Sequence, residues 1–380
     1  MNELVFTNAR VVAVDDEFDG SVAVRDGLIT AVDEGRSHAS GVIDCDGDYL
    51  VPGFVELHTD NLEKHFLPRP GVKWPSRAAV MAHDAQIAAA GITTVFDALA
   101  LGDIFRDSSR VEGLEDMLGG LAAARDGEAL RAEHRLHLRC ELSYHRVLET
   151  FERVMDDPAV GLVSIMDHTP GQRQFVDIEK YRVYQTKKLG MTDAQFDAFV
   201  AEKQDVQRRF SVPNRAGILE RAHARGFVLA SHDDATAEHV KESAESGMTI
   251  AEFPTTLAAA QASHQTGLKV LMSGPNLVLG GSHSGNIAAR DLAAKGLLDI
   301  VSSDYVPMSL PLAAFALAAA GIGIDLPGAI RLVSHNPAQA AALEDRGTIA
   351  AGLRADLARI TCVDGLPVVR SVWRGGQRIV

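Results

Sequence analysis

The 380-residue sequence has few cysteines, no long apolar run and no excess of positive charge. Its three cysteines, Cys45, Cys140 and Cys362, are too few and too scattered for a disulfide framework, so we expect a reduced, cytoplasmic setting. The longest apolar stretch, 310–326, is rich in Ala and Gly and includes Asp325, so it predicts a buried helix and not a membrane span. The first 20 residues have neither the basic region nor the apolar core of a signal peptide.

The formal net charge of −14 argues against a nucleic-acid-binding protein, which needs a basic surface. It also means that a polyanionic substrate must be held by local cations or a metal ion, against the field of the whole protein. We therefore expect a small-molecule partner, with no nucleic acid and no membrane.

The segment 51–75 is the most informative part of the chain. Its apolar run, Gly53–Leu57, predicts a buried parallel strand that ends in His58-x-Asp60. Residues two apart on a strand point to the same side, so the imidazole and the carboxylate converge where the strand ends. A cationic stretch without any acid follows, and it contains Lys64, His65, Arg69, Lys73 and Arg77. This pattern indicates a metal hydrolase that acts on an anionic substrate.

Strand-like runs alternate with helical stretches through the middle of the chain, which favours βα units and a parallel sheet. Eight such runs are Gly53–His58, Ile92–Asp97, Leu136–Leu142, Gly161–His168, Phe227–His232, Met248–Phe253, Leu268–Ser273 and Leu298–Asp304. Eight βα units predict a (β/α)₈ barrel with its site at the carboxyl ends of the strands. The first 50 or so residues and the last 35 or so instead alternate apolar and polar residues around turns, so the two ends could pair into one small sheet domain.

Potential metal ligands or acids follow nearly every predicted central strand. They are His58, Asp60, Asp97, Glu141, Asp167, His168, His232, Asp233, Asp234, Glu252 and Asp304. Any one of them could be an ordinary hydrogen-bonded residue near a loop. Since chance explains the whole set poorly, we predict a metal site.

Several strings resemble the amidohydrolase superfamily: VPGFVELHTD, GITTVFD, SHDD, SSDYVP and GTIAAGLRADL. The resemblance covers nearly the whole chain. It implies a metal-dependent (β/α)₈ barrel over 52–344 and a small β-sandwich domain formed by 1–51 and 345–380. His58-x-Asp60 departs from the His-x-His pattern of most members.

Longer strings are similar to a narrower family, the α-D-ribose 1-methylphosphonate 5-triphosphate diphosphatases of the carbon–phosphorus lyase pathway. These strings are ELHTDNLEKHFLPRPGVKWP, HLRCELS, MDHTPGQRQF, SHDDAT, AEFPTT, GGSHSGN and SDYVP. The resemblance implies cleavage of a ribosyl 5-triphosphate to the 5-monophosphate and pyrophosphate, by attack of a metal-bound hydroxide on the α phosphorus. Two alternatives stay open: an amidohydrolase or deaminase that cleaves a C–N bond, and a barrel that has lost catalysis and serves in assembly.

The resemblance assigns metal-ligand roles to His58, Asp60, His168, His232 and Asp304, with Asp304 and His232 as catalytic residues. We place Glu141 at the bridging position, with Glu252 and Asp167 as alternatives. The mixed imidazole and carboxylate set favours Zn²⁺, with Mn²⁺ or Fe²⁺ as alternatives and with one or two ions.

Phosphate binding is predicted in the glycine-rich loop after the seventh strand, where backbone N–H groups can surround an anion. The loop residues are Gly281, Ser282, His283, Ser284 and Asn286, and the cationic side chains are those of Lys64, His65, Arg69 and Arg173. A plain turn is the alternative for the loop, and a solvated helix face is the alternative for the charges around Arg173.

The segment 169–213 shows no clear strand and has helical spacing near its end. It predicts either a lid over the barrel or a contact between subunits of a homo-oligomer.

Overall fold

The computed structural model describes residues 3–105, 109–175, 178–179, 181–183, 190–282 and 285–380. The chain forms two compact units. The first comprises 1–97, 117–135 and 272–380, and the second comprises 98–116 and 136–271.

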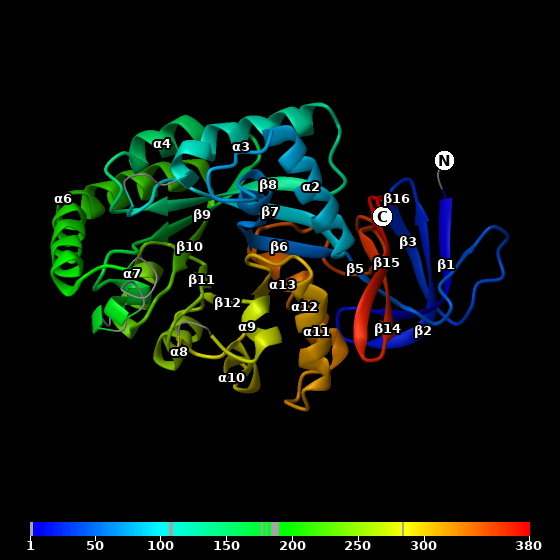
Figure 1. The fold of residues 1–380 in the computed structure, drawn as a ribbon. Helices are drawn as coiled ribbons and strands as arrows, with labels where there is room; N and C mark the ends of the chain where they lie inside the picture. Colours follow the sequence, from blue (N-terminus) through cyan, green and yellow to red (C-terminus); the bar gives the residue numbers. More distant parts are fainter. Residues whose placement is uncertain (1–2, 106–108, 176–177, 180, 184–189, 283–284) are drawn as a thin grey trace. The chain divides into compact units, whose positions relative to one another are not determined.

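The two ends of the chain share one mainly antiparallel sheet within the first unit, with strand order β16-β15-β14-β5-β1-β2-β3 and with β4 on β1. Its strands are β1 (Glu3–Val12), β2 (Glu17–Arg25), β3 (Leu28–Glu34), β4 (Ile43–Asp44), β5 (Tyr49–Pro52), β14 (Leu357–Val363), β15 (Leu366–Arg374) and β16 (Gln377–Arg378). β5 joins the two ends, because it pairs in parallel with β1 and antiparallel with β14. The blue and red strands of Figure 1 show this pairing, which confirms that the ends form one sheet.

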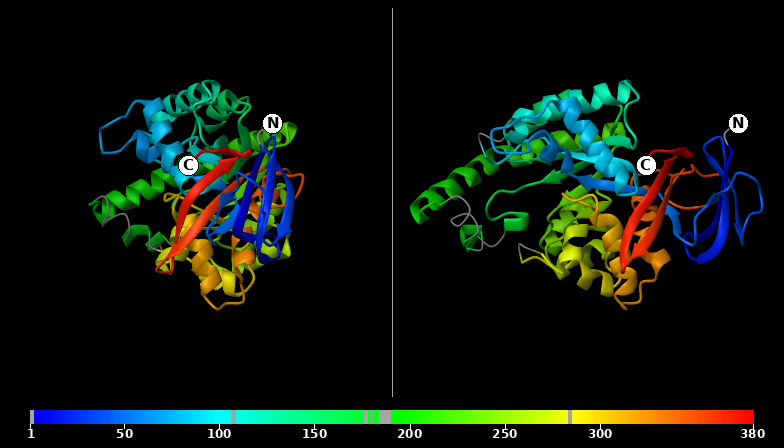
Figure 2. Two further views of the ribbon diagram at one scale, coloured as in Figure 1. Left: turned by 90° about the vertical axis from the view of Figure 1, so that its right-hand side faces the viewer. Right: turned by 45° about the vertical axis from the view of Figure 1, so that its right-hand side comes forward.

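Alternating apolar side chains of this sheet form a core of their own. Phe6 from the start of the chain meets Trp373 from its end, edge to face, with ring centroids 4.7 Å apart. Val11, Val22 and Leu357 are fully buried in the same cluster. Residues from both ends therefore complete one hydrophobic core. Figure 2 shows the terminal strands from two further sides.

The second sheet has eight strands in the order β13-β12-β11-β10-β9-β8-β7-β6. They are β6 (Phe54–Thr59), β7 (Ile92–Ala100), β8 (Glu133–Glu141), β9 (Val160–Met166), β10 (Val228–His232), β11 (Ile250–Glu252), β12 (Lys269–Ser273) and β13 (Ile300–Ser302). A parallel bridge between Thr59 and Asp304 joins the two end strands, so the barrel is nearly closed. All eight predicted strands are present, and the predicted barrel class is confirmed.

Helices connect these strands. They are α1 (Asn61–Phe66), α2 (Ser76–Ala89), α3 (Ser109–Asp126), α4 (Val147–Val154), α6 (Asp193–Arg225), α7 (Ala237–Glu245), α8 (Leu257–Gln265), α9 (Gly274–Leu279), α10 (Ala289–Ala294), α11 (Ser309–Ala319), α12 (Leu326–Arg331) and α13 (His335–Ala340), with a 3₁₀ turn, η1 (Arg173–Phe175). Among the described residues, no helix is long and apolar enough to cross a membrane.

The longest helix, α6, lies in the second unit and begins inside the segment 169–213. Thr192 and Gln195 form a reciprocal capping box at its start, which satisfies two backbone N–H groups. Gly226 ends it in a left-handed conformation, φ 66°. The helix continues through Pro213 for 12 more residues than the predicted segment, because capping and packing outweigh one lost hydrogen bond.

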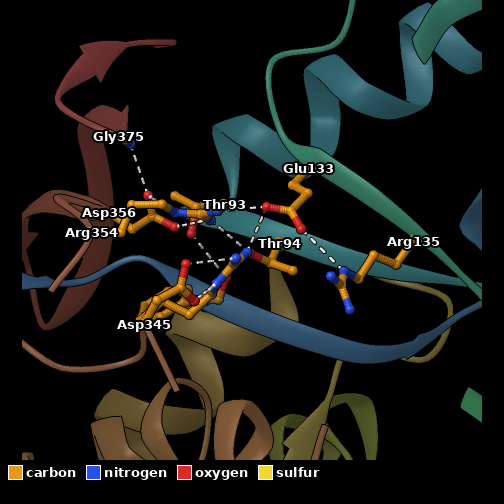
Figure 3. A network of polar contacts seen from close by, with 10 residues as sticks. Thr93, Thr94, Glu133, Arg135, Asp345, Arg354, Asp356 and Gly375 are labelled. Atoms are coloured by element: carbon orange, nitrogen blue, oxygen red, sulfur yellow. Dashed lines mark hydrogen bonds and ion pairs between the residues drawn. The ribbon is translucent and has the colours of Figure 1, made fainter. Parts of the chain in front are cut away.

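A polar network in the first unit links the terminal sheet to the amino ends of barrel strands (Figure 3). Glu133, at the start of β8, accepts hydrogen bonds from Arg346 at 2.6 Å and from Arg354 at 2.5 Å. Both arginines also donate to Thr94 Oγ1 on β7. Burial would raise the pKa of Glu133, but the two guanidiniums outweigh it and lower that pKa to about 2.

Candidate metal centre

In the first unit, the carboxyl end of β6 meets the carboxyl end of β13. The Asp304 N–H donates to the His58 carbonyl at 3.0 Å, and the Asp60 N–H donates to the Asp304 carbonyl at 3.0 Å. Asp304 is held at φ 55°, a left-handed conformation that is costly for a non-glycine residue. The structure thus brings together the two segments that carry these residues, one with His58 and Asp60 and the other with Asp304.

Glu56 reinforces this junction, and sequence reasoning missed it. The side chain is fully buried and accepts hydrogen bonds from the His58 N–H at 2.6 Å, the Ser303 N–H at 2.5 Å and the Ser302 hydroxyl at 2.7 Å. Burial raises the pKa of Glu56 to about 7, although these hydrogen bonds oppose the rise. The available signal was an acid inside an apolar strand, two residues before His58 and therefore on the same face.

In the second unit, two histidines at strand ends share one carboxylate. The Asp233 Oδ2 atom lies 3.7 Å from His168 Nε2 and 3.5 Å from His232 Nε2. Possible ligand atoms of these three residues lie within 4.8 Å of one another, which is compatible with a shared ion. Asp233 was visible in the string SHDD but was not chosen as a ligand. Its left-handed backbone, φ 58°, is not visible in the sequence.

The other nitrogen of each imidazole faces a buried glutamate. His168 Nδ1 lies 2.7 Å from Glu141 Oε2, and His232 Nδ1 lies 3.1 Å from Glu252 Oε2. Carboxylates commonly hold metal-binding histidines in this way, and they fix the ring orientation and the tautomer. Glu141 and Glu252 therefore lie where they can orient the two Nε2 atoms. A bridging role for Glu141 stays a prediction, as does the alternative role of Glu252.

Asp167, the other alternative for the bridging position, is engaged elsewhere. Its carboxylate accepts hydrogen bonds from the Thr169 N–H at 3.0 Å and from the Gln207 amide at 3.1 Å. These contacts connect the end of β9 to helix α6.

The carboxylates around His168 in the second unit favour a positive charge there. Burial would lower the pKa of His168, but hydrogen bonds with Asp233 and Glu141 raise it to about 10. The same carboxylates would attract a divalent cation. The donor set of imidazole nitrogens and carboxylate oxygens fits Zn²⁺, and it also fits Mn²⁺ or Fe²⁺.

Of the predicted cationic residues near His58, Lys64 lies beside the strand ends. Its ammonium donates to the Tyr305 carbonyl at 2.6 Å and lies 4.5 Å from the centre of the Tyr305 ring. His65 instead contacts Gln86 on α2 through Nε2 at 2.9 Å. Arg69 is exposed in a short turn that pairs with Val72.

The predicted phosphate contact of Arg173 is not supported by its surroundings. Its guanidinium is largely buried and bonds to Asp234, and it also bonds to Glu242 at 2.8 Å. These carboxylates hold one N–H of each terminal nitrogen, and their negative charge offsets the positive charge that would attract a phosphate.

We expect Arg173→Ala to lower the melting temperature and to leave KM for a triphosphate within about threefold, because buried Asp234 loses its cationic partner, whereas half-exposed Glu242 still pairs with Arg215. Thermal unfolding and steady-state kinetics on the same sample would check this. A large rise in KM without loss of stability would restore the phosphate-binding role.

The predicted glycine-rich loop does not follow β12 directly. Helix α9 intervenes, and Gly280 ends it in a left-handed conformation, φ 78°. Gly281, Ser282 and Asn286 are half-buried after this turn, whereas His283 and Ser284 lie outside the described residues. Phosphate binding by this loop stays a prediction.

A second histidine cluster, in the first unit, has the spacing of a metal site but a complete set of internal hydrogen bonds. Asp97 joins His83 Nε2 at 2.7 Å to His134 Nδ1 at 2.8 Å. The remaining ring nitrogens contact Asn61 at 3.0 Å and Asp84 at 3.3 Å. Burial would lower the pKa of His134, but Asp97 and Asp84 raise it to about 9. We interpret this cluster as a buried salt-bridge network.

Comparisons with known proteins agree with this architecture. A model of the amidohydrolase family matches residues 49–379. A curated relative from Escherichia coli (strain K12), named alpha-D-ribose 1-methylphosphonate 5-triphosphate diphosphatase, is 48% identical over 377 residues, covering 99% of this chain and 100% of the relative. An imidazolonepropionase from Solibacter usitatus is 28% identical and covers 91% of this chain and 85% of its own.

Solved structures support the fold at low sequence identity. A 5-methylcytosine deaminase from Klebsiella pneumoniae superposes with a TM-score of 0.67 at 15% identity, covering 99% of this chain and 97% of its own. A dihydropyrimidinase from Brevibacillus agri gives a TM-score of 0.64 at 14% identity, and the match covers 100% of this chain and 95% of the dihydropyrimidinase. With the family model matched over most of the sequence, this chain belongs to the amidohydrolase family of hydrolases.

Proposed function

We propose that this enzyme hydrolyses α-D-ribose 1-methylphosphonate 5-triphosphate to the 5-monophosphate and pyrophosphate. The observation that carries the proposal is 48% identity to the Escherichia coli diphosphatase over essentially the whole of both chains. The clusters of imidazole and carboxylate groups at the strand ends agree with hydrolytic chemistry, and Lys64 adds a cation suited to a phosphorylated substrate.

We also propose that the strand-end residues bind a divalent metal ion. The candidate ligands in the first unit are His58, Asp60 and Asp304, and those in the second unit are His168, His232 and Asp233. Glu141 and Glu252 would orient the histidines, or Glu141 would bridge. A divalent cation bound there would polarise the phosphoryl oxygens and lower the pKa of a bound water.

In the proposed reaction, Asp304 accepts a proton from the attacking water. The water oxygen forms a bond to the phosphorus nearest the ribose, and the bond breaks between that phosphorus and the oxygen that links it to the second phosphorus. The proton then passes to solvent or to the pyrophosphate that leaves. Lys64 would partly neutralise charge that develops on the outer phosphates.

Turnover in ¹⁸O-labelled water tests the position of cleavage. We expect the label on the ribosyl 5-phosphate and none in pyrophosphate, since attack at the inner phosphorus leaves the outer pair intact. Mass spectrometry of both products would measure it. Label in orthophosphate, with a diphosphate left on the sugar, would place the attack at the outer phosphorus. Ammonia release from a cyclic amide or a nucleobase, without any triphosphate cleavage, would favour the C–N alternative.

A further inference from the structure

A cavity of about 480 Å³ lies within the second unit, a size typical of small-molecule sites. Its walls come from 103–105 after β7, from 143–146 after β8 and from 202–210 on α6. One wall residue, Ser143, donates its hydroxyl proton to Glu141 Oε1 at 2.8 Å. The cavity therefore begins beside the carboxylate that holds His168.

The aromatic rings of Phe105, Tyr144, His145 and Phe210 line this cavity. Phe105 stacks on Phe199 with ring centroids 5.9 Å apart and planes 20° from parallel. His145 contacts Tyr144 at 5.1 Å and Phe210 at 6.1 Å between centroids. These faces can pack against an apolar group of a ligand.

Lys203 supplies a buried positive charge to the same cavity. The residue is 8% exposed, and its ammonium lies 3.4 Å from Glu202 Oε1 and 5.3 Å from the centre of the Phe199 ring. An ammonium has three donors, and this long ion pair uses one of them. A buried charge is costly without close partners, so an anionic ligand that pairs with the Lys203 ammonium would stabilise it.

The other charges of the cavity already have close partners. Glu149 binds Arg146 through both carboxylate oxygens, at 3.0 Å and 2.8 Å. Asp205 pairs with Arg209 at 3.0 Å. Asp103 accepts a hydrogen bond from the Phe105 N–H at 3.1 Å. Arg146 and Arg209 also line the cavity, but they are about half exposed and paired, whereas Lys203 is buried with one long ion pair.

We propose, on the basis of the proposed function, that this cavity binds the phosphonate end of the substrate. Lys203 pairs with the phosphonate oxygen, and the aromatic wall packs against the organic group on phosphorus. With Arg146 and Arg209 paired to Glu149 and Asp205, the one buried ammonium favours this end over the triphosphate. A phosphonate esterified to the sugar keeps one ionisable oxygen, which matches one ammonium, whereas a triphosphate carries several charges and needs several cations.

Two substrates that differ only at C1 test the assignment: α-D-ribose 1-methylphosphonate 5-triphosphate and ribose 5-triphosphate. We expect Lys203→Met to lower kcat/KM for the first, mainly through KM, by roughly ten- to a hundredfold, the range for one charge-assisted contact. For the second substrate, the change should stay within about threefold. Lys241→Met, which removes an exposed lysine of α7, is the matched control and should change neither value.

Binding of the product α-D-ribose 1-methylphosphonate 5-phosphate, measured by calorimetry, gives a readout that does not need turnover. Lys203→Met should weaken it roughly ten- to a hundredfold relative to Lys241→Met. Equal losses on both triphosphates, or unchanged product binding, would overturn the subsite. If the wild-type enzyme hydrolyses neither triphosphate, the proposed function fails by itself, and the calorimetry still decides whether Lys203 binds the phosphonate.

Discussion

His232→Ala is expected to lose activity by several orders of magnitude and to lose bound metal as well. The Nε2 atom of His232 lies 3.5 Å from Asp233, and no other side chain of β10 offers an imidazole at that position. Because we propose His232 as a metal ligand, its loss should remove both the charge stabilisation and the water activation that a metal provides. Asp304→Asn should lose activity to a similar degree, because an amide cannot accept the proton of the attacking water.

Comparing Glu252→Gln with His232→Ala separates the effect of the proposed orienting group from that of the proposed metal ligand. Glu252→Gln keeps the shape beside His232 Nδ1 but removes the charge, so we expect metal affinity to fall roughly ten- to a hundredfold and added metal to restore activity. Metal content by mass spectrometry and phosphate release would be measured on each variant. Exposed His38→Ala is the control. Full turnover of His232→Ala after exhaustive chelation would contradict the metal-hydrolase interpretation.

The barrel was predictable because its strands are short apolar runs with clear ends. Gly91 precedes Ile92, and Gly267 precedes the run that becomes β12, so turns bound these strands in the sequence itself. His58, His168 and His232 each stand at or just beyond a strand end. Local pattern was enough to place each of them at the carboxyl end of its own strand.

The hydrogen bonds and ion pairs around the predicted site residues were not predictable, because they join residues that are far apart in the sequence. Arg173 meets Asp234 and Glu242, which follow it by 61 and 69 residues. The sequence shows Arg173 within the family string MDHTPGQRQF, but it does not show that two acids surround its side chain in the fold. Glu56 is a similar case, because its partners Ser302 and Ser303 lie almost 250 residues away.

Helix α9 shows that a short helix is also difficult to predict from the sequence. Its six residues begin at Gly274 and Pro275, directly after β12, so the predicted phosphate loop starts later than expected. Pro at the first turn and Ser273 as the amino-terminal cap favour a helix there. These signals were present in the sequence, but one short turn of helix is difficult to distinguish from a loop.

The second large effect concerns stability. Glu133→Ala should lower the free energy of unfolding by roughly 3 kcal/mol, because it leaves the guanidiniums of Arg346 and Arg354 partly buried without their shared carboxylate. Chemical denaturation would measure the change. Exposed Glu344→Ala, in the adjacent segment, should stay within about 0.5 kcal/mol of the wild type. A similar small change for Glu133→Ala would mean that the network adds little to stability.

The pH dependence of the unfolding free energy tests whether the negative charge of Glu133 causes the stabilisation. Because the two arginines lower the pKa of Glu133 from 4.5 to about 2, the folded state binds the proton less readily than the unfolded state does. This contribution is complete above pH 4.5 and is lost as the pH falls towards 2. Glu133→Gln cannot ionise, so the difference in unfolding free energy between wild type and Glu133→Gln should shrink as the pH is lowered from 6 to 3. A difference that stays constant over this range would assign the effect to packing and not to the carboxylate charge.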